Sequence, residues 1–225
     1  MTEVAAYAIG VGVQPLDHPE RDSIGGWPFL DVGQGWPACF CGERMVLFFQ
    51  FDVPGDVEHF GGSHLLVFHC REHNDASGPP DDCGQLAPAF WNAPQPPYPA
   101  PFWRVLLQDG SVLTSQHEPR VQARALTVRR FQDEPDAWGR GAQLFKVGGA
   151  PSWAQGAESY QCACGAELRY LCQVPENMEF TTLPDAPEQP YSMPDAYQLF
   201  LGNEVYLLAC PKRCDPAAVW PVNQN

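Results

Sequence analysis

Residues 23–50, SIGGWPFLDVGQGWPACFCGERMVLFFQ, have a second copy in residues 146–173, KVGGAPSWAQGAESYQCACGAELRYLCQ. The two copies lie 123 residues apart and align without a gap. The residues of the first copy that recur unchanged in the second are Gly25, Gly26, Pro28, Gly33, Cys39, Cys41, Gly42 and Gln50. A repeat made of turn formers, thiols and a following apolar run indicates one supersecondary unit that is used twice.

The composition indicates a packed protein in a reducing compartment. The 225 residues include seven Trp and thirteen Phe, which favour a folded core over disorder. The N-terminal residues lack the pattern of a signal peptide, and no apolar stretch is long enough to span a bilayer. We therefore expect a cytoplasmic protein, in which the nine cysteines bind metal rather than form disulfides.

The net charge limits the possible partners. Twenty-seven acidic residues against thirteen basic ones give a net charge of −14. Such a chain repels phosphate backbones and anionic membrane surfaces, so we expect neither a nucleic-acid nor a membrane partner. If the chain has a macromolecular partner, we expect a basic protein, because its charge would be opposite to that of the chain.

The order of strand-like and proline-rich segments divides the chain into three parts. Residues 1–75 form a first pseudo-repeat unit, in which residues 45–53 and 64–69 are expected to be buried strands. Residues 76–142 comprise a proline-rich arm and a connecting hairpin. Residues 143–225 form the second pseudo-repeat unit.

The remaining segments complete a predominantly β prediction. Asp109-Gly110 and Gly202-Asn203 each separate two strand-like runs, as in hairpins. Residues 120–131 fit either an amphipathic helix or a strand. We therefore expect an α+β fold, predominantly β, with two pseudo-repeated units packed as one compact protein. The strand-like runs beside the two turns are residues 103–108 and 111–116, then 196–201 and 204–209.

In each unit, a Cys-x-Cys-Gly turn precedes one strand and another cysteine follows a later strand. Thiols from a turn and from a neighbouring strand end can converge on one tetrahedral ion. The second unit offers a complete set of four thiols, Cys162, Cys164, Cys210 and Cys214. Because four cysteines leave no open position for water, the expected role is structural.

The first unit supplies Cys39, Cys41 and Cys70, and its fourth ligand is open. Cys83 is the favoured candidate, because it makes two four-cysteine sets, while His69 or His73 are the alternatives. The spacing of one residue in each Cys-x-Cys turn is shorter than in usual zinc knuckles. We nevertheless expect two structural Zn²⁺ ions and assign Cys172, inside an apolar run, to the core.

Two other patterns carry alternative interpretations. A hydrolase could recruit Ser63 with His64, His69 or His73, although the chain has no G-x-S-x-G elbow. The aromatic residues of the proline-rich arm fit either a peptide-binding groove or packing over the protein's own core. These aromatic residues are Trp91, Tyr98, Phe102 and Trp103.

The duplicated pattern resembles the YwqG-like family (domain of unknown function 1963). The resemblance lies in residues 23–54 and 146–177, where a Gly-Gly-x-Pro opening leads to an apolar strand ending in Gln. The cysteines are similar to those of programmed cell death protein 2 and its relatives, which are regarded as chaperones of a ribosomal protein. The resemblance implies protein binding, with metal that supports the fold.

We therefore expect a non-enzymatic, zinc-stabilised protein-interaction module that binds a basic partner. Its role would be chaperone-like or of an immunity type. The alternative from another class is a hydrolase, or another enzyme, that uses the region of His64, His69 and His73.

Overall fold

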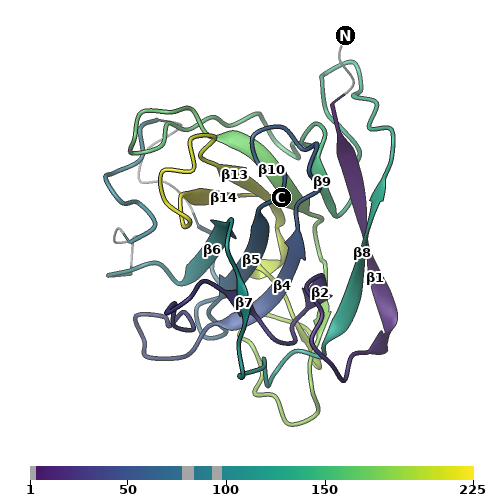
Figure 1. Cartoon of the computed structure of the whole chain (residues 1–225), viewed down its shortest axis with the longest axis vertical. Helices are drawn as coiled ribbons and strands as arrows, with labels where there is room; N and C mark the ends of the chain where they lie inside the picture. The colour runs from purple at the N-terminus through teal and green to yellow at the C-terminus, as the bar shows by residue number, and fades with distance from the viewer. Residues whose placement is uncertain (1–3, 78–83, 93–97) are drawn as a thin grey trace.

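The structure is a computed structural model, and it describes residues 4–77, 84–92 and 98–225. Its central feature is a ten-stranded antiparallel sheet that curls into a nearly closed barrel (Figure 1). The strands, in sheet order, are β14 (Val219–Gln224), β13 (Glu204–Ala209), β10 (Arg169–Val174), β9 (Lys146–Gly148), β1 (Ala6–Pro15), β8 (Arg124–Arg130), β2 (Ser23–Ile24), β4 (Val46–Asp52), β5 (His64–His69) and β6 (Trp103–Gln108). Two small sheets pair β3 (Phe29–Leu30) with β7 (Val112–Leu113), and β11 (Phe180–Thr181) with β12 (Ala196–Tyr197).

The described residues contain no α-helix, so the expected α+β class is wrong and the fold is all-β. Their one helical element is the short 3-10 helix η1 (Phe200–Gly202). Residues 120–131, which fitted either a helix or a strand, supply β8. This strand lies between β1 and β2 and pairs with both, which requires extended backbone. None of the described residues form a helix long and apolar enough to cross a membrane.

Both expected hairpins are also wrong. The segment after Asp109-Gly110 contains β7, but β7 pairs with β3 and not with β6. Before Gly202-Asn203, β12 pairs with β11, while β13 forms its hairpin with β14. In each case a segment distant in sequence supplies the hydrogen-bond partner, which a local turn signal does not reveal.

The sheet has the same order when it is followed outward from its central pair, β1 and β8. One half continues through β9, β10, β13 and β14, and the other through β2, β4, β5 and β6. The two halves of the chain exchange their first strands. β1, from the N-terminal half of the chain, pairs with β9 of the C-terminal half, whereas β8, from the C-terminal half, pairs with β2 of the N-terminal half. The segments 1–75, 76–142 and 143–225 therefore all contribute strands to one sheet.

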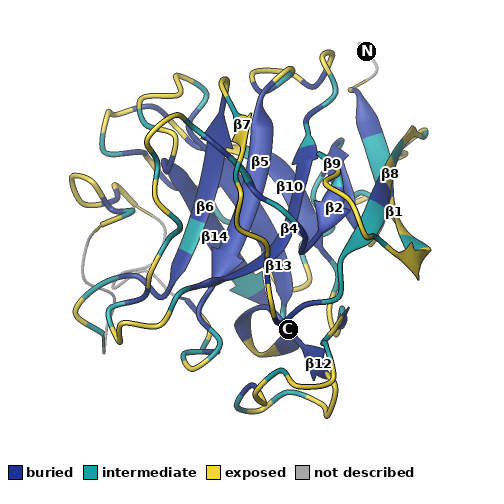
Figure 2. Cartoon of the chain, turned by 60° about the horizontal axis from the view of Figure 1, so that its bottom comes forward, coloured by how far each residue is buried: buried dark blue, intermediate teal, exposed yellow. Residues whose placement is uncertain are grey.

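The β1–β8 ribbon extends beyond the barrel on the right of Figure 1. Ala6 and Ile9, at the barrel end of β1, are buried, whereas Val13 near its other end is exposed. Figure 2 shows the same contrast between the buried barrel strands and the exposed outer ribbon.

A strand glutamine holds the Gly-Gly-x-Pro loop in each copy of the repeat. The Phe29 amide donates to Oε1 of Gln50 at 3.0 Å, and the Ser152 amide donates to Oε1 of Gln173 at 3.1 Å. The Gln50 amide nitrogen also donates to the Trp27 carbonyl at 2.7 Å. The identical glutamines of the two copies thus accept the same kind of hydrogen bond from the loop, which explains why the repeat ends on this residue.

The edge strands β6 and β14 approach each other and nearly close the barrel. The Leu107 amide donates to the Pro216 carbonyl at 2.8 Å, and the rings of Trp103 and Trp220 lie 5.7 Å apart. Phe90, from the proline-rich arm, packs 6.0 Å from Trp220 and is buried. Of the four aromatic residues for which a groove or core packing was expected, Phe102 and Trp103 are buried in the core, while Trp91 and Tyr98 are half-buried.

Candidate metal centres

The Cys-x-Cys-Gly turns of the two copies have the same backbone geometry. In the first, the Cys39 amide donates to the Glu43 carbonyl at 2.8 Å, and the Gly42 amide donates to the Cys39 carbonyl at 2.9 Å. In the second, the corresponding bonds join Cys162 to Ala166 at 2.7 Å and Gly165 to Cys162 at 2.8 Å. Both glycines have positive φ, 88° and 82°, which only glycine adopts without strain.

A third cysteine stands at the end of a neighbouring strand in each half. Cys70 follows β5, and its amide donates to the Phe102 carbonyl at 2.7 Å. Cys210 follows β13, and its amide donates to the Ala218 carbonyl at 3.0 Å. Both residues are buried. The sheet therefore positions each thiol against the turn that precedes the adjacent strand, β4 or β10.

The second centre brings its four thiols together as the sequence predicts. Sγ of Cys162 lies 3.4 Å from Sγ of Cys214, and Sγ of Cys164 lies 3.6 Å from Sγ of Cys210. All four sulfurs lie within 4.8 Å of one another. Sulfur ligands of a tetrahedral zinc ion lie about 3.8 Å apart, so the set could hold such an ion.

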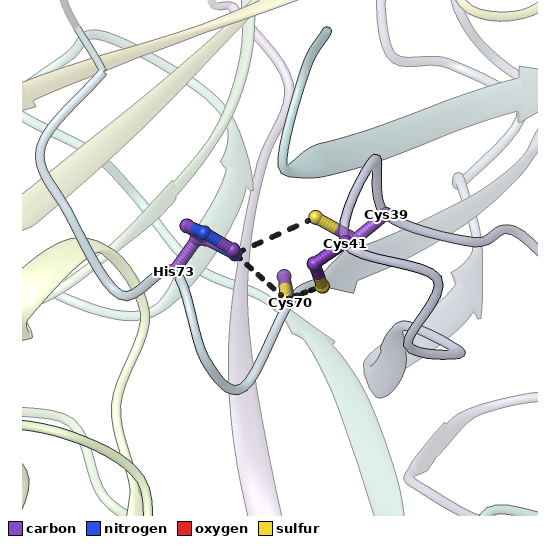
Figure 3. A group of neighbouring side chains, drawn as sticks. All are labelled: Cys39, Cys41, Cys70 and His73. Carbon is purple, nitrogen blue, oxygen red and sulfur yellow. Dashed lines mark hydrogen bonds between the residues drawn. The ribbon is translucent and has the colours of Figure 1, made fainter. Parts of the chain in front are cut away.

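The first centre is formed by three cysteines and one histidine (Figure 3). Nδ1 of His73 lies 3.7 Å from Sγ of Cys39 and 3.5 Å from Sγ of Cys70. Sγ of Cys41 lies 3.8 Å from Sγ of Cys70. For a tetrahedral zinc with mixed ligands, sulfur and nitrogen lie about 3.5 Å apart, so this set also fits a metal ion.

The fourth position of the first centre was left open by the sequence. Cys83, the favoured candidate, lies outside the described residues. His73 belongs to the group, and its spacing from Cys70 was the available signal, since two intervening residues are typical of zinc knuckles. His69 lies instead in the core, where its Nδ1 donates to the Cys70 carbonyl at 2.8 Å. Burial lowers the pKa of His69 to about 3.

The eight described cysteines are all free, so none of them forms a disulfide with another. Their separations of 3.4 to 3.8 Å far exceed an S–S bond, which is about 2.05 Å long. Cys172 lies in the core, where burial raises its pKa, and belongs to neither four-residue group.

Hydrogen bonds lower the pKa of one thiol in each four-residue group, Cys70 in the first and Cys164 in the second. A hydrogen bond from the Cys39 thiol lowers the pKa of Cys70 to about 5, against the opposing effect of burial. The same bond raises the pKa of Cys39. In the second centre, the Ala166 amide lowers the pKa of Cys164 to about 7, while burial raises that of Cys162 to about 11. Binding of a metal ion would displace the remaining protons.

The residues proposed for a hydrolase have other partners. The Ser63 hydroxyl is buried and donates to Asp109 at 3.0 Å. His64 contacts Asp52 through Nδ1 at 2.8 Å and Gln50 through Nε2 at 3.2 Å. Since His69 lies in the core and His73 in the metal group, the three histidines occupy three separate environments.

No protein-family model matches the chain, and no curated protein matches it. The resemblance to the YwqG-like family therefore stays a prediction based on the quoted motifs.

Proposed function

We propose that this chain is a non-enzymatic protein-interaction module that two structural zinc ions stabilise. One observation carries the proposal: each half of the sheet places a closed set of four ligand atoms at its corresponding turn and strand end. A set of four protein ligands leaves no position for a catalytic water. The metal would therefore act on the fold.

Each ion would join segments that are distant in sequence. The first centre spans residues 39–73 and the second spans residues 162–214. Closing such loops restricts the unfolded chain, and metal binding contributes directly to the free energy of folding. Free thiols need a reducing environment, which supports a cytoplasmic location.

The proposed partner is a basic protein, because the chain carries a net charge of −14. Opposite charge speeds encounter, while buried aromatic contacts supply most of the affinity. A chaperone-like or immunity-type role fits this pattern. The motifs shared with the YwqG-like family and with programmed cell death protein 2 support the same role.

Metal analysis of the purified, reduced protein tests the scaffold. We expect about two zinc ions per chain, one for each four-ligand group. Strong chelators should remove them only together with loss of the folded state, as circular dichroism would record. Reduced protein that is folded and metal-free would contradict the proposal, as would a zinc ion with a bound water.

Capture of proteins from the native host tests the binding role. We expect the chain to recover a basic protein, and the amount recovered to fall as salt rises from about 0.05 M to about 0.5 M. Recovery that is indifferent to salt, or an acidic captured protein, would contradict the electrostatic part of the proposal.

A further inference from the structure

An aromatic cluster surrounds the metal-group residue His73. The ring of Phe40 lies 4.4 Å from the His73 ring and 5.2 Å from the Tyr98 ring, and the rings of His73 and Tyr98 lie 5.0 Å apart. Tyr98 packs in turn edge-on against the buried Phe102, at 5.3 Å. The cluster is therefore anchored on the core and shares a residue with the first metal centre.

A second loop, residues 183–195, is fastened beside this cluster and lies near β12 at the bottom of Figure 2. Asn74, which is buried, donates to the Pro190 carbonyl and to the Ser192 hydroxyl, both at 3.3 Å. The next residue, Asp75, accepts a hydrogen bond from the Tyr98 hydroxyl. Tyr191, between the two residues that Asn74 holds, is thus placed next to the cluster.

Tyr191 has two features that packing does not explain. Its φ of 64° lies in the left-handed region, which is unfavourable for a bulky residue. Its side chain nevertheless gains no burial, since the residue is 84% exposed. Backbone strain that displays a large ring to solvent is typical of a contact site. Met193 and Leu201 are exposed as well, and Leu201 is tied to Asn74 by its amide, at 2.9 Å.

Two other aromatic rings at the surface, those of Trp138 and Trp36, are each covered by an arginine of this chain. The guanidinium of Arg140 lies 4.9 Å from the ring centre of Trp138, which is 79% exposed, and that of Arg44 lies 4.2 Å from Trp36. Within the described residues, no cation covers Tyr191. Its ring face is therefore available to a cation from another molecule.

The loops around the cluster carry the charge that such a cation requires. Residues 70–77 and 183–195 include one basic side chain of the Lys or Arg type, Arg71, which pairs with Glu72 and donates to the Glu188 carbonyl. The acidic rim, as we name the carboxylates of these two loops, consists of Glu72, Asp75, Asp185, Glu188 and Asp195.

We propose that the aromatic patch, formed by Phe40, Tyr98, Tyr191, Met193 and Leu201, binds an arginine-containing segment of a basic partner protein. The proposal rests on the function proposed above and names its contact surface. A guanidinium stacks on aromatic faces and pairs with carboxylates in two-pronged geometry, while an ammonium does both less well. The patch and the acidic rim together offer both kinds of contact.

A labelled peptide of alternating arginine and glycine tests the surface, with fluorescence anisotropy of the metal-loaded, full-length protein as the readout. We expect this peptide to bind more tightly than its lysine counterpart, and a glutamate counterpart not to bind. Tyr191→Ala should weaken binding about fivefold, because one stacking face is lost. Glu188→Gln should weaken binding and flatten its salt dependence.

The matched control is Trp138→Ala, which removes a similarly exposed ring that Arg140 of the same chain already covers. It should leave peptide affinity unchanged, and zinc content and circular dichroism verify that each variant is folded. The surface is wrong if wild-type protein fails to bind the arginine peptide, or if Tyr191→Ala binds as wild type does. Salt-sensitive capture of a basic protein that persists in Tyr191→Ala would overturn the surface and leave the proposed function standing.

Discussion

His73 and Cys214 are the fourth members of the two candidate metal centres, and as ligands they would carry different charges. An imidazole binds zinc as a neutral ligand, whereas a thiolate adds a negative charge and must lose its proton first. A zinc ion with three thiolates and one histidine carries a net charge of −1, and one with four thiolates carries −2. The two candidate centres therefore differ in the type of one of their four residues, although their turns have the same geometry.

Substitution of the fourth ligand tests this difference. His73→Ala should lower the zinc content from about two ions to about one per chain, because three ligands hold zinc far less tightly than four. Cys83→Ser should retain both ions. Zinc measured by mass spectrometry on folded protein decides between them. The opposite pattern, with zinc lost from Cys83→Ser and kept in His73→Ala, would make Cys83 the ligand.

Among the elements, the corresponding strands β4 and β10 of the two copies each hold a loop in addition to pairing within the sheet. Both strands contain the same bulge, between Leu47 and Phe49 and between Tyr170 and Cys172. A bulge bends its strand and increases its twist. It lies just before the strand glutamine, which reaches the Gly-Gly-x-Pro loop through side-chain hydrogen bonds.

Removal of one strand glutamine should be costly. Gln173→Leu leaves the Ser152 amide and the Ala142 carbonyl without the partners they have at 3.1 and 3.3 Å. We expect the free energy of unfolding to fall by about 1–3 kcal/mol, because both groups are half-buried and a fully buried unsatisfied group costs about 1–3 kcal/mol. Urea denaturation measures the loss.

The control for this variant is Gln132→Leu, at an exposed glutamine that bonds to Glu134 on the surface. Its effect should stay within about 0.5 kcal/mol. Equal stability of the two variants would show that the strand glutamine does not hold the loop.

The exchange of first strands makes the whole molecule one structural unit. β1 pairs with β8 and β9, which both come from the C-terminal half of the chain, while β8 pairs with β2 of the N-terminal half. Neither half can therefore complete its own part of the sheet. The seam between β6 and β14 adds a second junction, where Trp103 and Trp220 meet.

Fragments of the chain should show this interdependence. We expect residues 1–115 and residues 116–225 to be unfolded when expressed separately, since each lacks strands that its edges require. Mixed together in the presence of zinc, they should form a stable complex, detected by size-exclusion chromatography and by dispersed amide signals. A folded, monomeric fragment of residues 1–115 would contradict the exchange.

The local sequence was sufficient for some features of the fold. Strands β4 and β5 follow from their apolar runs, and the two turns follow from Cys-x-Cys-Gly, because glycine accepts the positive φ at that point without strain. The thiols of the second centre follow from the same pattern, since each precedes or follows a recognisable strand. These features depend on residues close together in the chain.

The tertiary structure decided the features that depend on distant partners. β8 is extended because β1 and β2 take its backbone hydrogen bonds, although its own pattern also fits a helix. His73 joins the first centre because the sheet brings the end of β5 beside the turn before β4. Tyr191 reaches the same region because Asn74 holds its loop there. The sequence by itself determined the repeated turn and its thiols, while strand exchange and long-range packing determined what lies around them. Local preferences act over a few residues, whereas pairing between strands is settled by competition across the whole chain.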